Sequence, residues 1–351
     1  MSHQIAAAQR VFINEEGELR CGWRIFVFVI CFAVAIIVIG GLILSAIEIF
    51  IPSLRLTGEP PDPQEHLSDR EVIYLISTSA ANLLAVLVAT GVCARLLERR
   101  SLGSVGLKFH PGWFRDSLLG CAIGGAAIAL AVGIAKLGGA VSFESKALLD
   151  PPMTASSMLL GGALAALFFL VAAAFEELIF RGFAFQALVH NVGPLVPLAL
   201  TSALFGVAHL GNPSATTFST INTMLAGEWL GLAYLATRSL WLATALHFSW
   251  NFVMVFVFGL PVSGRTDLAR LALLQARSGS PESLSGGSYG PEGGVAATIV
   301  LILATLFIWK TKLFRISDEM REAIAHGRPP GPDSLSITTV AEAPSQVRTD
   351  E

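Results

Sequence analysis

Charged residues are scarce in this sequence. Asp, Glu, Lys and Arg make up 14% of its 351 residues, against about 25% in a typical soluble domain. Hydrophobic residues make up 53%. A water-soluble particle of this size cannot bury so much apolar surface, so the composition excludes a soluble enzyme, a disordered chain and a fibrous protein. It predicts a protein dissolved in lipid.

An excess of positive charge is also lacking. Lys and Arg number 23 against 26 Asp and Glu, and the net charge is −3. The chain therefore has no electrostatic footprint for nucleic acid, and none is expected as a partner. The four cysteines share no close spacing, which argues against a disulfide framework and against a Cys-x-x-Cys metal site.

Long apolar runs are abundant, and a helix of about 20 residues spans a bilayer. Eight uncharged or nearly uncharged runs follow one another along the chain: 25–47, 72–94, 117–135, 154–175, 194–208, 216–237, 239–259 and 293–309. They predict an all-α, polytopic membrane protein with about eight transmembrane helices. The fourth helix is expected to continue past Arg181 towards Val189, because nothing breaks it before Gly193. No small-residue cleavage site follows the first run, so it is interpreted as a membrane helix and not as a signal peptide.

The basic residues predict the orientation. With the N-terminus inside, 16 of the 23 Lys and Arg fall on the cytoplasmic side, as the positive-inside rule requires. Both termini are therefore expected in the cytoplasm. We divide the chain into a cytoplasmic segment 1–23, a transmembrane domain 24–323 and a disordered cytoplasmic tail 324–351, with a Gly- and Ser-rich outer loop at 260–292.

Ionisable residues inside the apolar runs are few, and each costs roughly 2.5–3.5 kcal/mol near the bilayer centre. Glu177 and Arg181 are four residues apart, so they share a helix face and can pair. Glu176 lies about 100° round the helix from Glu177. The spacing predicts that Arg181 neutralises Glu177 and leaves Glu176 available for another task. A purely structural salt bridge is the alternative.

Two histidines follow on later helices. His209 lies four residues after Phe205, and His247 four residues before Asn251, so each pair shares a face. Glu176 and His209 are each about 16 residues from the turn between their helices, which predicts a common depth. Two histidines and one carboxylate are the ligand set of a catalytic zinc that activates water. The alternative for a single membrane histidine is a hydrogen bond between helices.

Glu228 interrupts the sixth run. It lies ten residues before Arg238, and His247 lies nine residues after it, so the two should share a depth in an antiparallel pair. We expect the Glu228 carboxylate to accept the second ring N–H of His247. The alternative is that Glu228 faces lipid or water and extends towards the membrane surface.

Taken together, Glu-Glu-x-x-x-Arg (176, 177, 181), Phe-x-x-x-His (205, 209) and His-x-x-x-Asn (247, 251) stand in order on successive apolar runs. This pattern resembles the CPBP intramembrane protease family, which includes CAAX prenyl endopeptidases and bacteriocin-processing enzymes. The motif-bearing core covers about 154–259. The resemblance implies an eight-helix membrane peptidase with a polar cavity open to the cytoplasm.

The resemblance also implies roles for single residues. Glu176 would be the catalytic acid and base that activates water, and His209 would share that role or bind metal. His247 would be a metal ligand or a transition-state contact, and Asn251 an oxyanion donor. Glu177 with Arg181 would be the structural pair. Phe175 and Phe205 would form the cavity wall, with lipid-facing packing as the alternative. One expectation is a single divalent metal, with zinc preferred, bound by Glu176, His209 and His247. The other expectation is a metal-free glutamate–histidine mechanism.

The expected function is therefore that of an endopeptidase that cleaves a membrane-associated or lipidated peptide near the cytoplasmic face. Membrane lipid is expected to surround the enzyme. A bacterial inner membrane is the expected location. The alternative is a non-hydrolytic bacteriocin-immunity or scaffolding protein on the same fold. A transporter with a Glu–His proton relay is disfavoured because the sequence shows no internal repeat.

Overall fold

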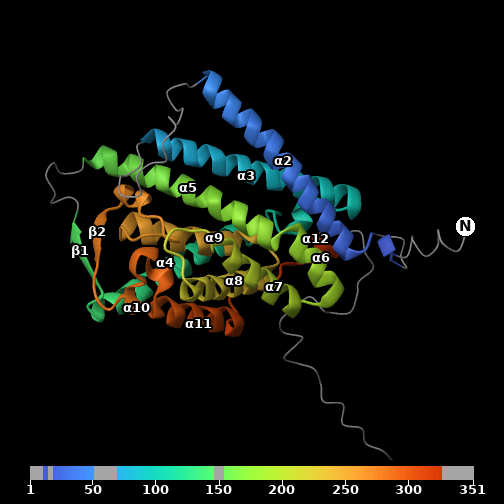
Figure 1. The fold of residues 1–351 in the computed structure, drawn as a ribbon. Coiled ribbons are helices and arrows are strands. Elements are labelled where there is room, and N and C mark those ends of the chain that lie inside the picture. Colours follow the sequence, from blue (N-terminus) through green and yellow to red (C-terminus); the bar gives the residue numbers. More distant parts are fainter. Residues whose placement is uncertain (1–10, 15–18, 51–68, 146–153, 326–351) are drawn as a thin grey trace, which may run out of the picture.

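The computed structural model describes residues 11–14, 19–50, 69–145 and 154–325 and is mainly helical. Each of the eight predicted apolar runs forms a helix (Figure 1): α2 (Cys21–Phe50), α3 (Asp69–Leu97), α4 (Trp113–Leu137), α5 (Ala155–Arg181), α7 (Leu195–Ala208), α8 (Thr217–Thr237), α9 (Leu240–Phe252) and α11 (Val295–Lys310). A short α12 (Asp318–Ala325) follows. The residues 1–10 and most of the predicted tail 324–351 lie outside the described residues.

Among the described residues, five helical segments are long and apolar enough to cross a membrane, by length and composition: 21–50, 71–97, 113–137, 155–192 and 240–257. The helices α7 and α11 are shorter, with 14 and 16 residues. Helix α8 is long enough, but Asn222, Thr223 and Glu228 lower its hydropathy. The structure therefore supports an integral membrane protein with five candidate spans, and eight full spans with cytoplasmic termini stay a prediction.

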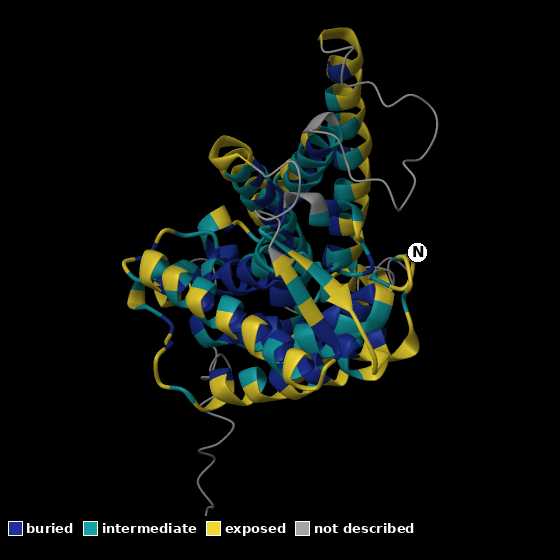
Figure 2. Cartoon of the chain, turned by 90° about the vertical axis from the view of Figure 1, so that its left-hand side faces the viewer, coloured by how far each residue is buried: buried dark blue, intermediate teal, exposed yellow. Residues whose placement is uncertain are grey.

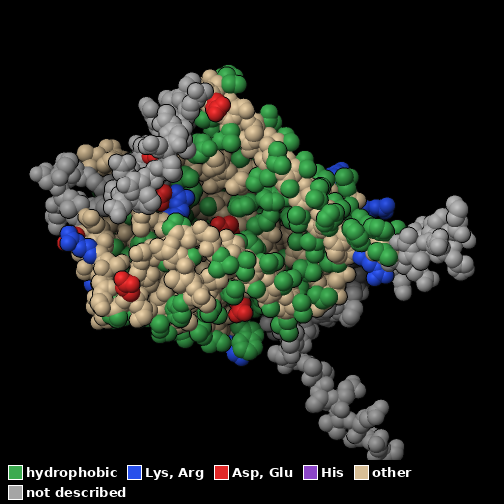
Figure 3. Space-filling view, viewed as in Figure 1, with side chains coloured by type: hydrophobic (Ala, Val, Ile, Leu, Met, Phe, Trp, Pro, Cys, Tyr) green, Lys and Arg blue, Asp and Glu red, His purple; other side chains and the backbone are tan. Residues whose placement is uncertain are grey.

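The surface of the helices is apolar, as expected for contact with lipid. Along α2, Ile37, Leu42 and Phe50 are 72%, 66% and 80% exposed. Figure 2 shows exposed positions along the projecting helices, and Figure 3 shows hydrophobic side chains spread over the same region. Apolar patches of this size on a soluble monomer would cause aggregation. They fit a protein surrounded by lipid.

The fourth predicted helix differs from expectation at one residue. Helix α5 ends at Arg181, and α6 (Phe183–Val192) begins after a break at Gly182. A Cβ atom on Gly182 would lie 2.2 Å from the carbonyl oxygen of Leu178, so only glycine fits this bend. A single glycine in an apolar run is compatible with a continuous helix, so the break at Gly182 could not be predicted from the sequence.

The expectation of an all-α fold misses a small sheet. Strand β1 (Val141–Ser145), after α4, pairs antiparallel with β2 (Leu274–Ser278) in the predicted outer loop. A helical turn at 253–257 continues α9, and the loop itself contains short helical turns at 267–271, 282–285, 287–289 and 291–293. The paired residues are more than 120 positions apart in the sequence, so no local sequence pattern predicts the sheet. It ties the 260–292 loop to the helical body.

Close contact between α4 and α9 positions the second histidine. A Cβ atom on Gly124 would lie 2.4 Å from the carbonyl oxygen of Leu246, and one on Gly120 would lie 2.9 Å from that of Leu242. Ser249 donates to the carbonyl oxygen of Gly120 at 3.4 Å. Small residues four apart allow two membrane helices to approach backbone to backbone. The α4 glycines thereby fix the position of α9, which carries His247 and Asn251.

Candidate active site

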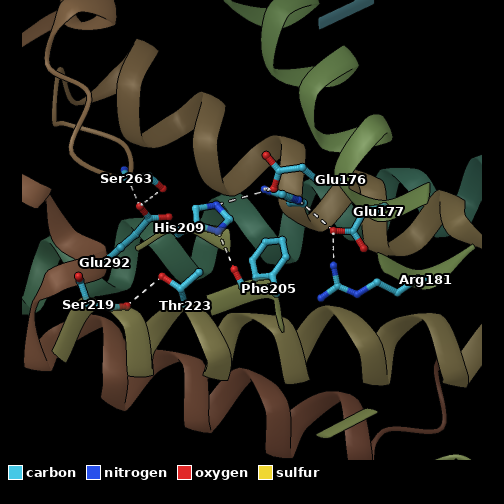
Figure 4. Close-up of polar contacts among 10 residues, drawn as sticks. Glu176, Glu177, Arg181, Phe205, His209, Ser219, Thr223, Ser263 and Glu292 are labelled. Atoms are coloured by element: carbon cyan, nitrogen blue, oxygen red, sulfur yellow. Dashed lines mark hydrogen bonds and ion pairs between the residues drawn. The ribbon is translucent and has the colours of Figure 1, made fainter. Parts of the chain in front are cut away.

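A fully buried ion pair lies beneath the site. Glu177 and Arg181 both have side chains that are 0% exposed, and Arg181 Nη1 donates to Glu177 Oε1 at 3.1 Å. Arg181 Nη2 donates to the carbonyl oxygen of Gly227 on α8 at 2.8 Å. The same Glu177 Oε1 accepts from His247 Nδ1 on α9 at 2.9 Å. The pair predicted from the four-residue spacing is present, and it links α5, α8 and α9 (Figure 4).

Glu176 lies on the neighbouring face of α5, with a side chain that is 27% exposed. Its Oε2 lies 3.9 Å from His209 Nε2 and 3.8 Å from His247 Nε2. This oxygen is buried and has no hydrogen-bond partner within the described residues. The three side chains, predicted from separate motifs on α5, the end of α7 and α9, therefore converge.

The second ring nitrogen of each histidine is held by an acceptor. His209, the C-cap of α7, directs Nδ1 at the carbonyl oxygen of Phe205 at 2.7 Å. His247 directs Nδ1 at the Glu177 carboxylate. A carbonyl or carboxylate oxygen accepts only, so each Nδ1 carries a hydrogen and donates it. In a neutral ring, each Nε2 then presents a lone pair towards Glu176, which is the form that accepts a proton or binds a metal.

Phe205 packs between the motif residues. It is 3% exposed, and its ring lies edge-on to Phe180 at 5.1 Å between centroids. The guanidinium of Arg181 lies 4.8 Å from its centroid, and the His209 ring lies at the same distance. A cation over an aromatic face is stabilised by the ring quadrupole. Phe205 therefore forms part of the site wall, and the alternative of lipid-facing packing is wrong for this residue.

A cavity of about 480 Å³ contains the site. Glu176, His209, His247 and Asn251 line it together with Phe175 and Phe205. Further aromatic walls come from Phe168, Phe169, Phe180, Trp229 and Trp250. Figure 3 shows a hollow near the middle of the molecule with acidic side-chain atoms inside. An apolar cavity with a few convergent polar groups is typical of a substrate site.

The opposite end of the cavity was missed by sequence reasoning. Its lining includes six polar residues from α8 and the connecting loops: Asn212, Asn222, Thr223, Ser263, Arg265 and Glu292. Three of these residues belong to the 260–292 loop, which the sequence predicts to lie outside the membrane. Only the polar pair Asn222–Thr223 within an apolar run could have indicated a polar lining on α8.

The predicted contact between Glu228 and His247 is wrong. Glu228 is half-buried and is not part of the cavity lining, and His247 Nδ1 is held by Glu177. The depth argument was close, because the preceding residue, Gly227, does reach the site through its carbonyl oxygen. One residue along a helix turns a side chain by about 100°, which is enough to take Glu228 away from the site.

The three converging side chains fit a zinc ion in donor type. Glu176 offers a carboxylate oxygen, and both histidines offer an Nε2 whose partner nitrogen is already hydrogen-bonded, as in metal-bound histidines. In their spacing, however, no group of three or more His, Cys, Asp and Glu side chains in the described part of the chain meets the geometry of a metal cluster. A bound metal therefore stays a proposal.

Comparison with known proteins gives one family match. Residues 158–253 match the family described as Rce1-like, type II CAAX prenyl endopeptidase Rce1-like. The matched segment holds all three motifs, and it confirms the predicted resemblance to the CPBP family. The description of this family names a peptidase, to which residues 158–253 are similar. No curated protein and no solved structure matches the chain.

Proposed function

We propose that this protein is an intramembrane endopeptidase that hydrolyses a peptide bond of a membrane-associated or lipidated polypeptide. The observation that carries the proposal is the Glu176 carboxylate, which faces two imidazole Nε2 atoms inside a cavity. A scaffold that only binds peptides would have no use for a carboxylate whose Oε2 is buried without a hydrogen-bond partner among the described residues, because such burial is costly.

The proposed reaction uses the residues as the structure orients them. Water between Glu176 and His209 loses a proton to this pair, and its oxygen attacks the carbonyl carbon of the scissile bond. The Asn251 amide is the proposed hydrogen-bond donor to the oxyanion. The accepted proton then passes to the leaving nitrogen as the carbon–nitrogen bond breaks. His247 is oriented by Glu177, which is itself neutralised by Arg181.

We place cleavage near the cytoplasmic face. His247 is seven residues beyond Leu240, the first residue of α9, which puts it about 10 Å from that end of the helix. This is the end next to Arg238, where the positive-inside rule predicts the cytoplasm. If a zinc ion takes part, Glu176, His209 and His247 would hold it, and it would supply Lewis acidity and a lowered pKa for bound water.

Substitution of the three converging residues tests the proposal. Glu176→Gln, His209→Ala and His247→Ala should each lower peptidase turnover by about 100-fold or more, the usual contribution of a general acid or base. Membrane proteomics of cells that carry wild-type or Glu176→Gln protein should show peptides that depend on Glu176. Glu144→Gln, in an exposed pair with Arg277, is the matched control. Near-wild-type turnover of Glu176→Gln would refute the proposal.

A further inference from the structure

The cavity has a second carboxylate at the end away from the buried ion pair. Glu292 lines the same space as Glu176 and His209, and Figure 4 shows it with Ser263 on the side of His209 opposite Glu177. Its Oε2 accepts from the Ser263 backbone N–H at 2.7 Å and from the Ser263 hydroxyl at 2.9 Å. A carboxylate has about four lone-pair sites, so Oε1 remains as an acceptor.

The charges around this end do not balance. Arg265, the guanidinium that lines the cavity, donates to both oxygens of Asp267, at 3.2 and 2.5 Å. Across the described ranges, Glu292 forms no ion pair with a Lys or Arg side chain. Two cavity carboxylates, Glu176 and Glu292, thus lack a Lys or Arg partner among the described residues, and the local field favours a positively charged occupant.

The backbone around Glu292 is held in place. Asn222 Nδ2 donates to the carbonyl oxygens of Glu292 and Gly294 at 2.8 and 3.1 Å. Asn222 Oδ1 in turn accepts from the Thr298 hydroxyl on α11 at 2.8 Å. A charged group on a braced backbone loses little entropy when it binds a partner.

We propose that Glu292 binds a Lys or Arg side chain of the substrate, so that the peptidase selects a basic residue close to the scissile bond. The basic residue would lie on the segment that extends from Glu176 towards the 260–292 loop. The aromatic cavity wall would cover the apolar stem of that side chain while its charged end reaches Glu292. This inference rests on the proposed function, and the rival is that Glu292 only fastens the loop through Ser263.

A binding experiment separates this inference from the proposed reaction. Fluorescent peptides with the same apolar sequence and a single Lys, Gln or Glu are titrated against the full chain in nanodiscs of zwitterionic lipid. The Glu176→Gln variant is used throughout so that no peptide is cleaved. The Lys peptide should bind about fivefold more tightly than the Gln peptide, as for a modest ion pair, and added salt should reduce the difference.

Three further substitutions, each in the Glu176→Gln background, decide between the ligand role and the tether. Glu292→Gln keeps an oxygen for both Ser263 bonds but removes the charge, and should abolish the preference for Lys. Ser263→Ala removes the hydroxyl tether and should retain it, as should Glu282→Gln, which removes an exposed charge from the same loop. Equal binding of the Lys and Gln peptides before these changes, or a preference that survives Glu292→Gln, would overturn the inference. Failure of the wild type to cleave any peptide would instead count against the proposed function.

Discussion

Replacing Glu177 with Gln should destabilise the protein more than any exposed charge substitution. The change leaves the Arg181 guanidinium, 0% exposed, without its buried carboxylate partner, while the Gly227 carbonyl and the Phe205 ring still contact it. Arg181 Nε already lacks a hydrogen-bond partner among the described residues. Removing one partner of a buried ion pair costs about 3–5 kcal/mol, because the other charge stays buried. The same change weakens the acceptor of His247 Nδ1.

The measurement is the free energy of unfolding in detergent, with the melting temperature as a second readout. Glu144→Gln removes a carboxylate from an exposed pair and should change stability by less than about 1 kcal/mol. The double variant Glu177→Gln, Arg181→Met should recover part of the lost stability, since it removes the uncompensated charge. A Glu177→Gln protein as stable as the wild type, or a double variant less stable than Glu177→Gln, would show that the pair does not hold the site together.

Three other outcomes are expected. Burial lowers the pKa of His110, and the nearby Asp116 carboxylate opposes this with a smaller effect. The neutral ring therefore stabilises the fold at pH values above the unfolded pKa of about 6.5. This stabilisation should be lost as the pH falls below that value and through the lower folded pKa, and His110→Gln should flatten the dependence of stability on pH. Gly124→Ala places a Cβ 2.4 Å from the Leu246 carbonyl oxygen and should lower stability by about 1–3 kcal/mol and reduce turnover. Gly133→Ala, whose Cβ would have nothing within 4 Å, should change neither stability nor turnover. Equal melting temperatures of the two variants would contradict the α4–α9 contact. If zinc is required, active protein should contain about one zinc per chain by elemental analysis, and fully active metal-free protein would favour the glutamate–histidine mechanism.

The sequence by itself determined which residues share a helix face. The four-residue spacing of Glu177 and Arg181 predicted their pair, and the level of Glu176 and His209 followed from equal distances to one turn. Both inferences depend on the period and rise of a helix, which are local properties. The apolar runs located all eight helices, because the hydropathy of a segment is also a local property. The motif pattern indicated the family that residues 158–253 match.

Only the tertiary structure decided how these faces meet. The rotation of α8 brings Gly227 and not Glu228 to Arg181, and it leaves Glu177 as the partner of His247. The pairing of β1 with β2 and the bonds from Asn222 to Glu292 and Gly294 bring the 260–292 loop to the cavity. These features depend on contacts between segments distant in sequence, and helical periodicity cannot encode them, because it fixes the angle between side chains on one helix but not the direction in which that helix faces its neighbours.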